Sequence, residues 1–133
     1  MMKFSSKACA NIIFAPMLWP NFAVRSFKIL SIIFAVIIIH ASLISAGSPN
    51  AIAHADKFFH ALAYTALTGA IRLGWPVVWG GFIIMISTGL GIGLEFAQAA
   101  FAQGRMGSIW DALANLSGAC IAIAALYPLR KRR

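Results

Sequence analysis

The chain has 133 residues, of which 61% are hydrophobic and only 11% are charged. A soluble domain is nearer to half apolar and a quarter charged, so this composition excludes a water-facing surface and predicts an integral membrane protein. The net charge of +8 does not indicate a nucleic-acid partner, because the basic residues gather at the two ends of the chain without an aromatic–basic platform. We expect these ends to contact anionic membrane lipid.

Four apolar segments predict an all-α bundle of four transmembrane helices. Residues 1–26 come first, as a basic tail with an apolar stretch that Pro16 and Pro20 interrupt, and we expect this stretch to lie at the membrane interface. A span needs about 20 residues, and the expected helices are 27–46, 58–73, 77–101 and 109–129, followed by a basic tail at 130–133. Gly74-Trp75-Pro76 is a turn signal between the second and third helices.

The basic residues predict how the helices are oriented. With four spans, both termini lie on one side together with Arg72, and only Lys57 and Arg105 lie on the other side. Since loops rich in Lys and Arg stay in the cytoplasm, we expect both termini to be cytoplasmic. The loops that follow the first and third helices are then external.

Polar side chains are predicted to converge at the external end of the bundle. Within each helix they recur at three- or four-residue spacing, which places them on one helix face. This is the pattern of a binding cluster in the bundle interior, to which we assign Asp56, Lys57, His60, Tyr64, Glu95, Gln98, Arg105, Asp111 and Asn115.

The two candidate catalytic residues of this cluster are Glu95 and Asp111. Ser108 and Asp111 have capping-box spacing, so helix capping competes with catalysis as the role of Asp111. Glu95 lies near the C-terminal end of its helix, where the helix dipole disfavours an anion. An acid inside a membrane indicates a functional site, so Glu95 is the stronger functional candidate, either protonated or paired with Lys57, Arg105 or His60.

No cofactor and no metal ion are expected from the sequence. A site made of Asp56, His60 and Glu95 is conceivable, but the spacing of these residues matches no established ligand signature. The chain also has no nucleophile elbow, phosphate-binding loop or zinc-protease motif.

The ordered set of polar residues resembles the VanZ-like family, over roughly residues 46–126. The resemblance implies a small multi-pass protein of the bacterial cytoplasmic membrane, with these residues at the characteristic family positions. Members are linked to low-level resistance to teicoplanin, a lipid-bearing glycopeptide. The matching motifs are Asp56-Lys57-x-x-His60-x-x-x-Tyr64-x-x-Leu67, Glu95-x-x-Gln98, and Arg105 followed by Asp111-x-x-x-Asn115-x-x-Gly118.

Three functions are compatible with these residue types. The favoured one is a non-enzymatic envelope protein whose external pocket binds a lipid head group, a lipid-linked wall precursor or a lipoglycopeptide. The second is a membrane enzyme for a lipid-linked substrate, in which Glu95 or Asp111 acts as general acid or base and Lys57 or Arg105 holds a phosphate. The third is a proton-coupled carrier component in which Glu95 titrates, and four short helices would then require an oligomer.

Overall fold

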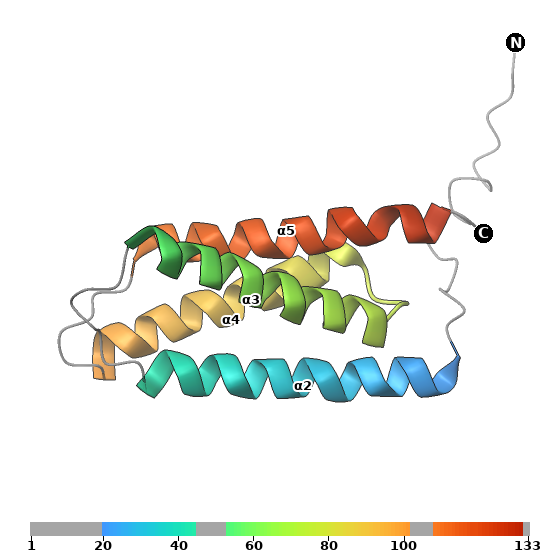
Figure 1. Ribbon diagram of the computed structural model, residues 1–133, viewed down its shortest axis with the longest axis horizontal. Helices are drawn as coiled ribbons and strands as arrows, with labels where there is room; N and C mark the ends of the chain where they lie inside the picture. The colour runs from blue at the N-terminus through green and yellow to red at the C-terminus, as the bar shows by residue number, and fades with distance from the viewer. Residues whose placement is uncertain (1–19, 45–52, 102–107, 132–133) are drawn as a thin grey trace, which may run out of the picture.

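The computed structural model describes residues 20–44, 53–101 and 108–131, and these ranges form four helices without any strand. The helices pack side by side along one common direction (Figure 1). In chain order they are α2 (Asn21–Ile44), α3 (Ala53–Gly74), α4 (Gly80–Phe101) and α5 (Ile109–Lys131). The expectation of an all-helical chain is therefore confirmed for the described residues.

Three of the four helices are long and apolar enough to cross a membrane, over Asn21–Leu43, Gly80–Ala100 and Ile109–Pro128. Their outer faces carry large exposed apolar side chains, such as Ile32 and Val36 of α2 and Met85 of α4. An apolar exterior of this kind suits lipid and not water. The helices thus support a membrane protein.

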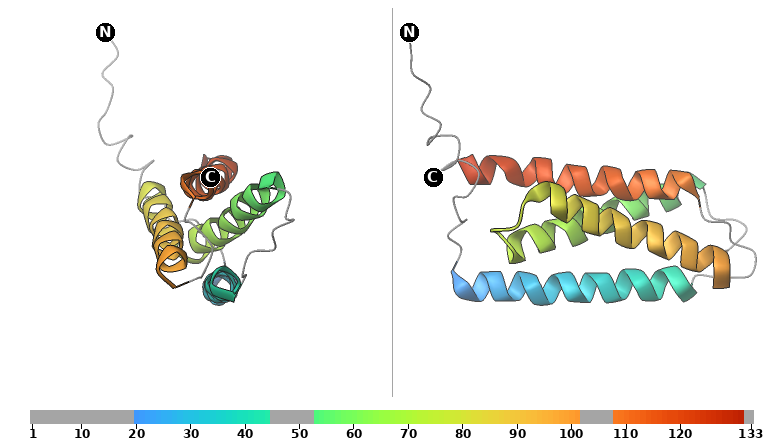
Figure 2. Two further views of the ribbon diagram at one scale, coloured as in Figure 1. Left: turned by 90° about the vertical axis from the view of Figure 1, so that its left-hand side faces the viewer. Right: turned by 180° about the vertical axis from the view of Figure 1, so that it is seen from behind.

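The helix α3 is less apolar than the other three because it contains Asp56, Lys57 and Arg72. It packs most extensively against α5, also against α2, and to a smaller extent against α4. Figure 2 shows α3 in the middle of the bundle, between α2 and α5. The neighbouring helices bury Tyr64 and Thr68 of α3. The polar face of the central turns of α3 therefore points into the bundle.

Consecutive helices run in opposite directions, so their ends form two groups (Figure 1). The start of α2, the junction of α3 with α4, and the end of α5 lie at one end of the bundle. The start of α3, the end of α4 and the start of α5 lie at the other. We call this second group the acidic end, since it holds Asp56, Glu95 and Asp111.

The first helix begins earlier than predicted. Residues 21–26 were assigned to the tail, but α2 begins at Asn21. The backbone carbonyl of Pro20 accepts the N–H groups of Ala23 at 2.9 Å and Val24 at 3.3 Å, so this proline immediately precedes the first turn of α2. The interfacial stretch predicted before it lies outside the described residues.

The second helix also begins earlier, at Ala53 and not at residue 58, and its first turns include Asp56 and Lys57. An acidic residue in the first turn suits the helix dipole. The last helix begins at Ile109 as predicted but continues past Pro128 to Lys131, into the expected tail.

The turn between α3 and α4 is longer than predicted, and α4 begins at Gly80 and not at residue 77. Arg72 explains the difference. Its guanidinium is buried and donates to the carbonyls of Pro76 at 2.7 Å and Val78 at 3.1 Å. These charged hydrogen bonds satisfy carbonyls that the turn leaves without helical partners.

The helices α3 and α5 make their closest approach at Gly118. A Cβ atom added at Gly118 would overlap the backbone oxygen of Ala61, so only glycine permits this contact. One turn further along α3, the Thr65 hydroxyl lies 2.8 Å from the Ala61 carbonyl oxygen and 3.0 Å from the Gly118 carbonyl oxygen, and its one proton is shared between them. Small residues at such crossings let membrane helices pack backbone against backbone, and here they set the spacing of the acidic end.

Candidate functional site

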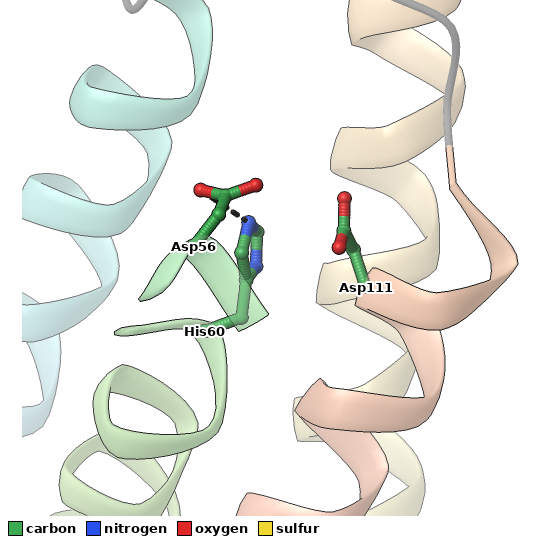
Figure 3. Close-up of side chains that lie close together, drawn as sticks. All are labelled: Asp56, His60 and Asp111. Carbon is green, nitrogen blue, oxygen red and sulfur yellow. Dashed lines mark ion pairs between the residues drawn. The ribbon is translucent and has the colours of Figure 1, made fainter. Parts of the chain in front are cut away.

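The acidic end brings together polar side chains from α3 and α5. Figure 3 shows Asp56 and His60 on α3 facing Asp111 on α5. The Nδ1 atom of His60 lies 3.0 Å from Oδ1 of Asn115, and its Nε2 atom lies 3.9 Å from Oδ1 of Asp56. The predicted convergence of the α3 and α5 stripes is therefore seen in the structure, with His60 at its centre.

Asp111 forms an ion pair across the same interface. Its Oδ1 lies 3.6 Å from Nζ of Lys57, and the Asp111 side chain is 8% exposed whereas that of Lys57 is 36% exposed. The distance is too long for a hydrogen bond, so the interaction is a charge–charge attraction. A buried carboxylate requires such compensation, and Lys57 supplies it without leaving the surface.

Glu95 has a structural role that the sequence analysis did not assign to it. Its Oε2 accepts the backbone N–H of Ser108 at 3.0 Å, and the Ser108 hydroxyl accepts the N–H of Trp110 at 3.3 Å. Ser108 is thus the N-cap of α5, and Glu95 makes the bond that the capping box had assigned to Asp111. The positive end of the α5 dipole stabilises the Glu95 anion, although the end of its own helix disfavours it.

Gln98 connects α4 to α2. Its Nε2 donates to the backbone carbonyl of Ser42 at 2.7 Å. Its Oε1 is buried and accepts no hydrogen bond from any residue that the structure describes. A buried acceptor of this kind costs free energy unless a hydrogen-bond donor reaches it. Gln98 therefore indicates a ligand that donates a hydrogen bond.

A cavity of about 240 Å³ opens beside Gln98, between α2, α3 and α4. Polar groups border part of it and apolar side chains border the rest. Glu95 and Asp111, the two candidate catalytic residues, do not line it. Its lining residues are Ile38, Ala41, Ser42, Asp56, Phe59, His60, Ala63, Tyr64 and Gln98.

Tyr64 is buried at the inner wall of this cavity. Gly91 of α4 makes room for it, since a Cβ at Gly91 would lie 3.1 Å from the Tyr64 hydroxyl oxygen and 2.6 Å from Nδ2 of Asn115. Tyr64 and Asn115 therefore meet α4 at Gly91. Arg105, the remaining member of the predicted cluster, lies outside the described residues.

Three other polar residues were not assigned to the predicted cluster. His40 of α2 is exposed and does not line the cavity. Ser42 and Arg72 were not predicted to matter. Ser42 contributes its backbone carbonyl, a group that every residue has, so the residue type gives no sign of this role. Arg72 could have been recognised, because a basic residue near the C-terminal end of a helix is a known capping signal.

Comparison of the chain with protein-family models, with curated proteins and with solved structures found no match. The function must therefore be inferred from the geometry of the acidic end.

Proposed function

We propose that this chain is a VanZ-like protein of the bacterial cytoplasmic membrane that binds the head group of an amphiphile in the cavity at its acidic end. In this proposal all four helices span the membrane, both termini are cytoplasmic and the acidic end faces outward. The segregation of charge along the bundle supports this orientation. Arg25, Lys28 and Arg72 lie toward the end opposite the three acids, and the basic side of a membrane protein is the cytoplasmic one.

The observation that carries the binding proposal is that Gln98 lines the cavity while its buried Oε1 has no hydrogen-bond donor among the described residues. Asp56 borders the same space and adds a second acceptor. A ligand that fits must therefore donate hydrogen bonds, as a sugar hydroxyl or an ammonium group does. Lys57, the basic residue expected to hold a phosphate, is paired with Asp111, so phosphate recognition is not favoured here.

The size and lining of the cavity restrict the ligand further. Its volume of about 240 Å³ is below the roughly 300–1,000 Å³ of sites for drug-sized ligands. It therefore accommodates one sugar or amine-bearing head group, while the rest of the molecule lies outside. Ile38 and Phe59 supply an apolar wall along which an acyl chain can leave toward lipid. A lipid-linked wall precursor and a lipoglycopeptide both have this combination of chemistry.

Binding is tested with acyl-bearing teicoplanin, titrated against the purified protein in lipid nanodiscs, with vancomycin as a glycopeptide that lacks the acyl chain. We expect saturable binding of teicoplanin. Gln98→Met should weaken it about tenfold, the value of one lost hydrogen bond of about 1.4 kcal/mol. The matched control is Thr65→Val, which removes a hydrogen bond to Gly118 outside the cavity lining.

Equal affinities for wild type and Gln98→Met would contradict the proposed site. In cells, expression of the wild type should raise the teicoplanin resistance of a susceptible bacterium, and Gln98→Met should lose this effect while Thr65→Val keeps it. Unchanged sensitivity together with unchanged pools of lipid-linked wall precursors would remove the link to glycopeptide resistance.

Membrane orientation is tested by cysteine labelling from outside intact cells. After replacement of Cys9 and Cys120 by alanine, a cysteine at position 104 should react with an impermeant maleimide. A cysteine at Val77, an exposed residue in the turn between α3 and α4, should react only after lysis. The opposite pattern would overturn the outward orientation of the acidic end.

An enzymatic function is the second candidate, and the pair of His60 and Asp56 favours it. Both residues line the cavity, and an imidazole beside a carboxylate is a common general acid–base unit. The catalytic role thereby moves from Glu95 and Asp111 to His60. If the protein turns over a lipid-linked substrate, His60→Gln should abolish turnover while retaining teicoplanin binding, and equal turnover by the variant would exclude this mechanism.

A further inference from the structure

Three side chains at the acidic end form a cluster with the donor atoms of a metal site. One atom each from Asp56, His60 and Asp111 can be chosen so that all three atoms lie within 4.8 Å of one another. Figure 3 shows that the cluster joins two residues of α3 to one of α5. Sequence spacing did not reveal it, because the third residue comes from another helix.

The hydrogen bonding of His60 prepares this residue for a metal ion. Its Nδ1 faces Oδ1 of Asn115 at 3.0 Å, so the Nδ1–H group donates to that oxygen. In a neutral His60 this tautomer leaves the lone pair on Nε2, which lies 3.9 Å from Oδ1 of Asp56. A histidine that ligates a metal through one nitrogen and donates from the other to an oxygen is the usual arrangement in proteins.

Asp111 supplies an independent indication of a missing ligand. Its side chain is 8% exposed, and its buried Oδ1 accepts no hydrogen bond from the described residues. The Lys57 ammonium balances its charge at 3.6 Å but does not satisfy its lone pairs. A carboxylate oxygen that is buried and without a hydrogen-bond donor is ready to coordinate a cation.

We propose that Asp56, His60 and Asp111 bind a divalent transition-metal ion of the Zn²⁺ class. Zn²⁺ takes one nitrogen and two carboxylate oxygens at about 2.0–2.2 Å, which places the donor atoms roughly 3.3–3.6 Å apart. The three donor atoms now lie within 4.8 Å of one another, so binding requires them to move closer, and the 41% exposed side chain of Asp56 has room to rotate. Asp56 and His60 also line the cavity, so the proposed ion lies beside it.

The position of Lys57 predicts the direction in which its substitution changes the metal affinity. A cation that approaches Asp111 must share this carboxylate with the Lys57 ammonium or displace it, so Lys57 opposes metal binding. Replacing Lys57 by glutamine removes this competition, and we expect Lys57→Gln to bind the metal more tightly. A cluster that served only structural ion pairing would show no such gain.

The proposal is tested on the full chain, purified in detergent and stripped with a chelator, by titration with Zn²⁺ alone and by the visible absorption of Co²⁺ as a substitute. We expect one Zn²⁺ per chain. Asp56→Asn and Asp111→Asn should weaken binding at least about tenfold, and Asn115→Leu, which removes the partner of the imidazole, by about 10–100-fold. His40→Gln is the matched control because His40 is exposed and outside the cluster.

Absence of Zn²⁺ and Co²⁺ binding by the folded wild type would overturn the proposal, and so would binding that persists unchanged in Asp56→Asn. Asp56 is half exposed, so its substitution tests the site even if a change at buried Asp111 prevents folding. Weaker binding in Lys57→Gln would also contradict it. These measurements contain no teicoplanin, so their outcome is independent of the teicoplanin-binding experiment.

Discussion

Replacement of Gly118 by alanine is the most direct test of the packing that builds the acidic end. The added Cβ would overlap the backbone oxygen of Ala61 and lie 3.0 Å from the Ala61 carbonyl carbon and 3.1 Å from its Cα. Carbon atoms pack best at about 3.5–4.0 Å. Because backbone atoms of α3 cannot rotate away as a side chain can, α3 and α5 must separate by roughly an ångström.

The magnitude follows from what this separation breaks. Overpacking of a tight core costs about 1–3 kcal/mol. The bond from the Thr65 hydroxyl to the Gly118 carbonyl, now 3.0 Å, would exceed hydrogen-bond length, as would the contact of His60 with Asn115. Each interhelical bond is worth about 0.6 kcal/mol in a membrane. We therefore expect a loss of about 2–4 kcal/mol in the free energy of unfolding, before any gain in helix propensity.

Gly89→Ala is the matched control. Gly89 lies in α4, and a Cβ added there would meet no atom within 4 Å. Both variants receive the same gain in helix propensity, up to about 1 kcal/mol, so the difference between them isolates the clash. The assay is reversible unfolding in mixed detergent micelles, followed by far-UV circular dichroism. If the two variants agree within about 0.5 kcal/mol, the close approach of α3 and α5 at Gly118 is wrong.

Substitutions at two further residues test the caps at opposite ends of the bundle. Arg72→Met removes the charged hydrogen bonds to Pro76 and Val78 and should cost about 2–4 kcal/mol in the same unfolding assay; a change below 0.5 kcal/mol would show that the turn does not depend on Arg72. Glu95→Gln should be nearly neutral because its amide oxygen still accepts the Ser108 N–H, whereas Glu95→Leu should lose about 1–2 kcal/mol. Equal stability of the two Glu95 variants would exclude the capping role.

Helical periodicity was sufficient to predict the interface of α3 with α5. Asp56, His60 and Tyr64 recur every four residues, as do Asp111 and Asn115, and the contact of His60 with Asn115 joins the two stripes. The prediction worked because a polar stripe on an otherwise apolar helix is costly to expose to lipid, so it faces the neighbouring helices. The facing of two such stripes follows from their residue types and spacing alone.

The partners of Glu95 and Gln98 could not be predicted in this way. Both side chains bond to main-chain atoms, of Ser108 and Ser42 respectively. Every residue presents the same N–H and C=O groups, so a sequence does not identify which of them a side chain will reach. Gly89 and Gly93 illustrate the same limit, since their spacing is typical of packed helices yet a Cβ at either would meet no atom within 4 Å.

The polar residues of α3 explain why it is not among the helices that are apolar enough to cross a membrane. A helix needs apolar side chains only where it meets lipid, and α3 is bordered by α2, α4 and α5. Phe58, Phe59 and Leu62 remain exposed on it, which is sufficient for the strip that its neighbours leave open. Its composition is therefore that of a helix at the centre of a bundle.

The three acidic residues differ in the groups that compensate their charge. This difference indicates which of the three we expect to have a functional role. Glu95 is held by the N-terminus of α5, and Asp111 is neutralised by Lys57, so each has a structural explanation for its burial. Asp56 is half exposed beside His60 and lines the cavity. Burial alone pointed to Glu95 as the functional acid, but a carboxylate that already accepts a backbone N–H is less available for chemistry. The pair of Asp56 and His60 lines the cavity and so has the access that ligand binding, proton transfer or metal coordination would require.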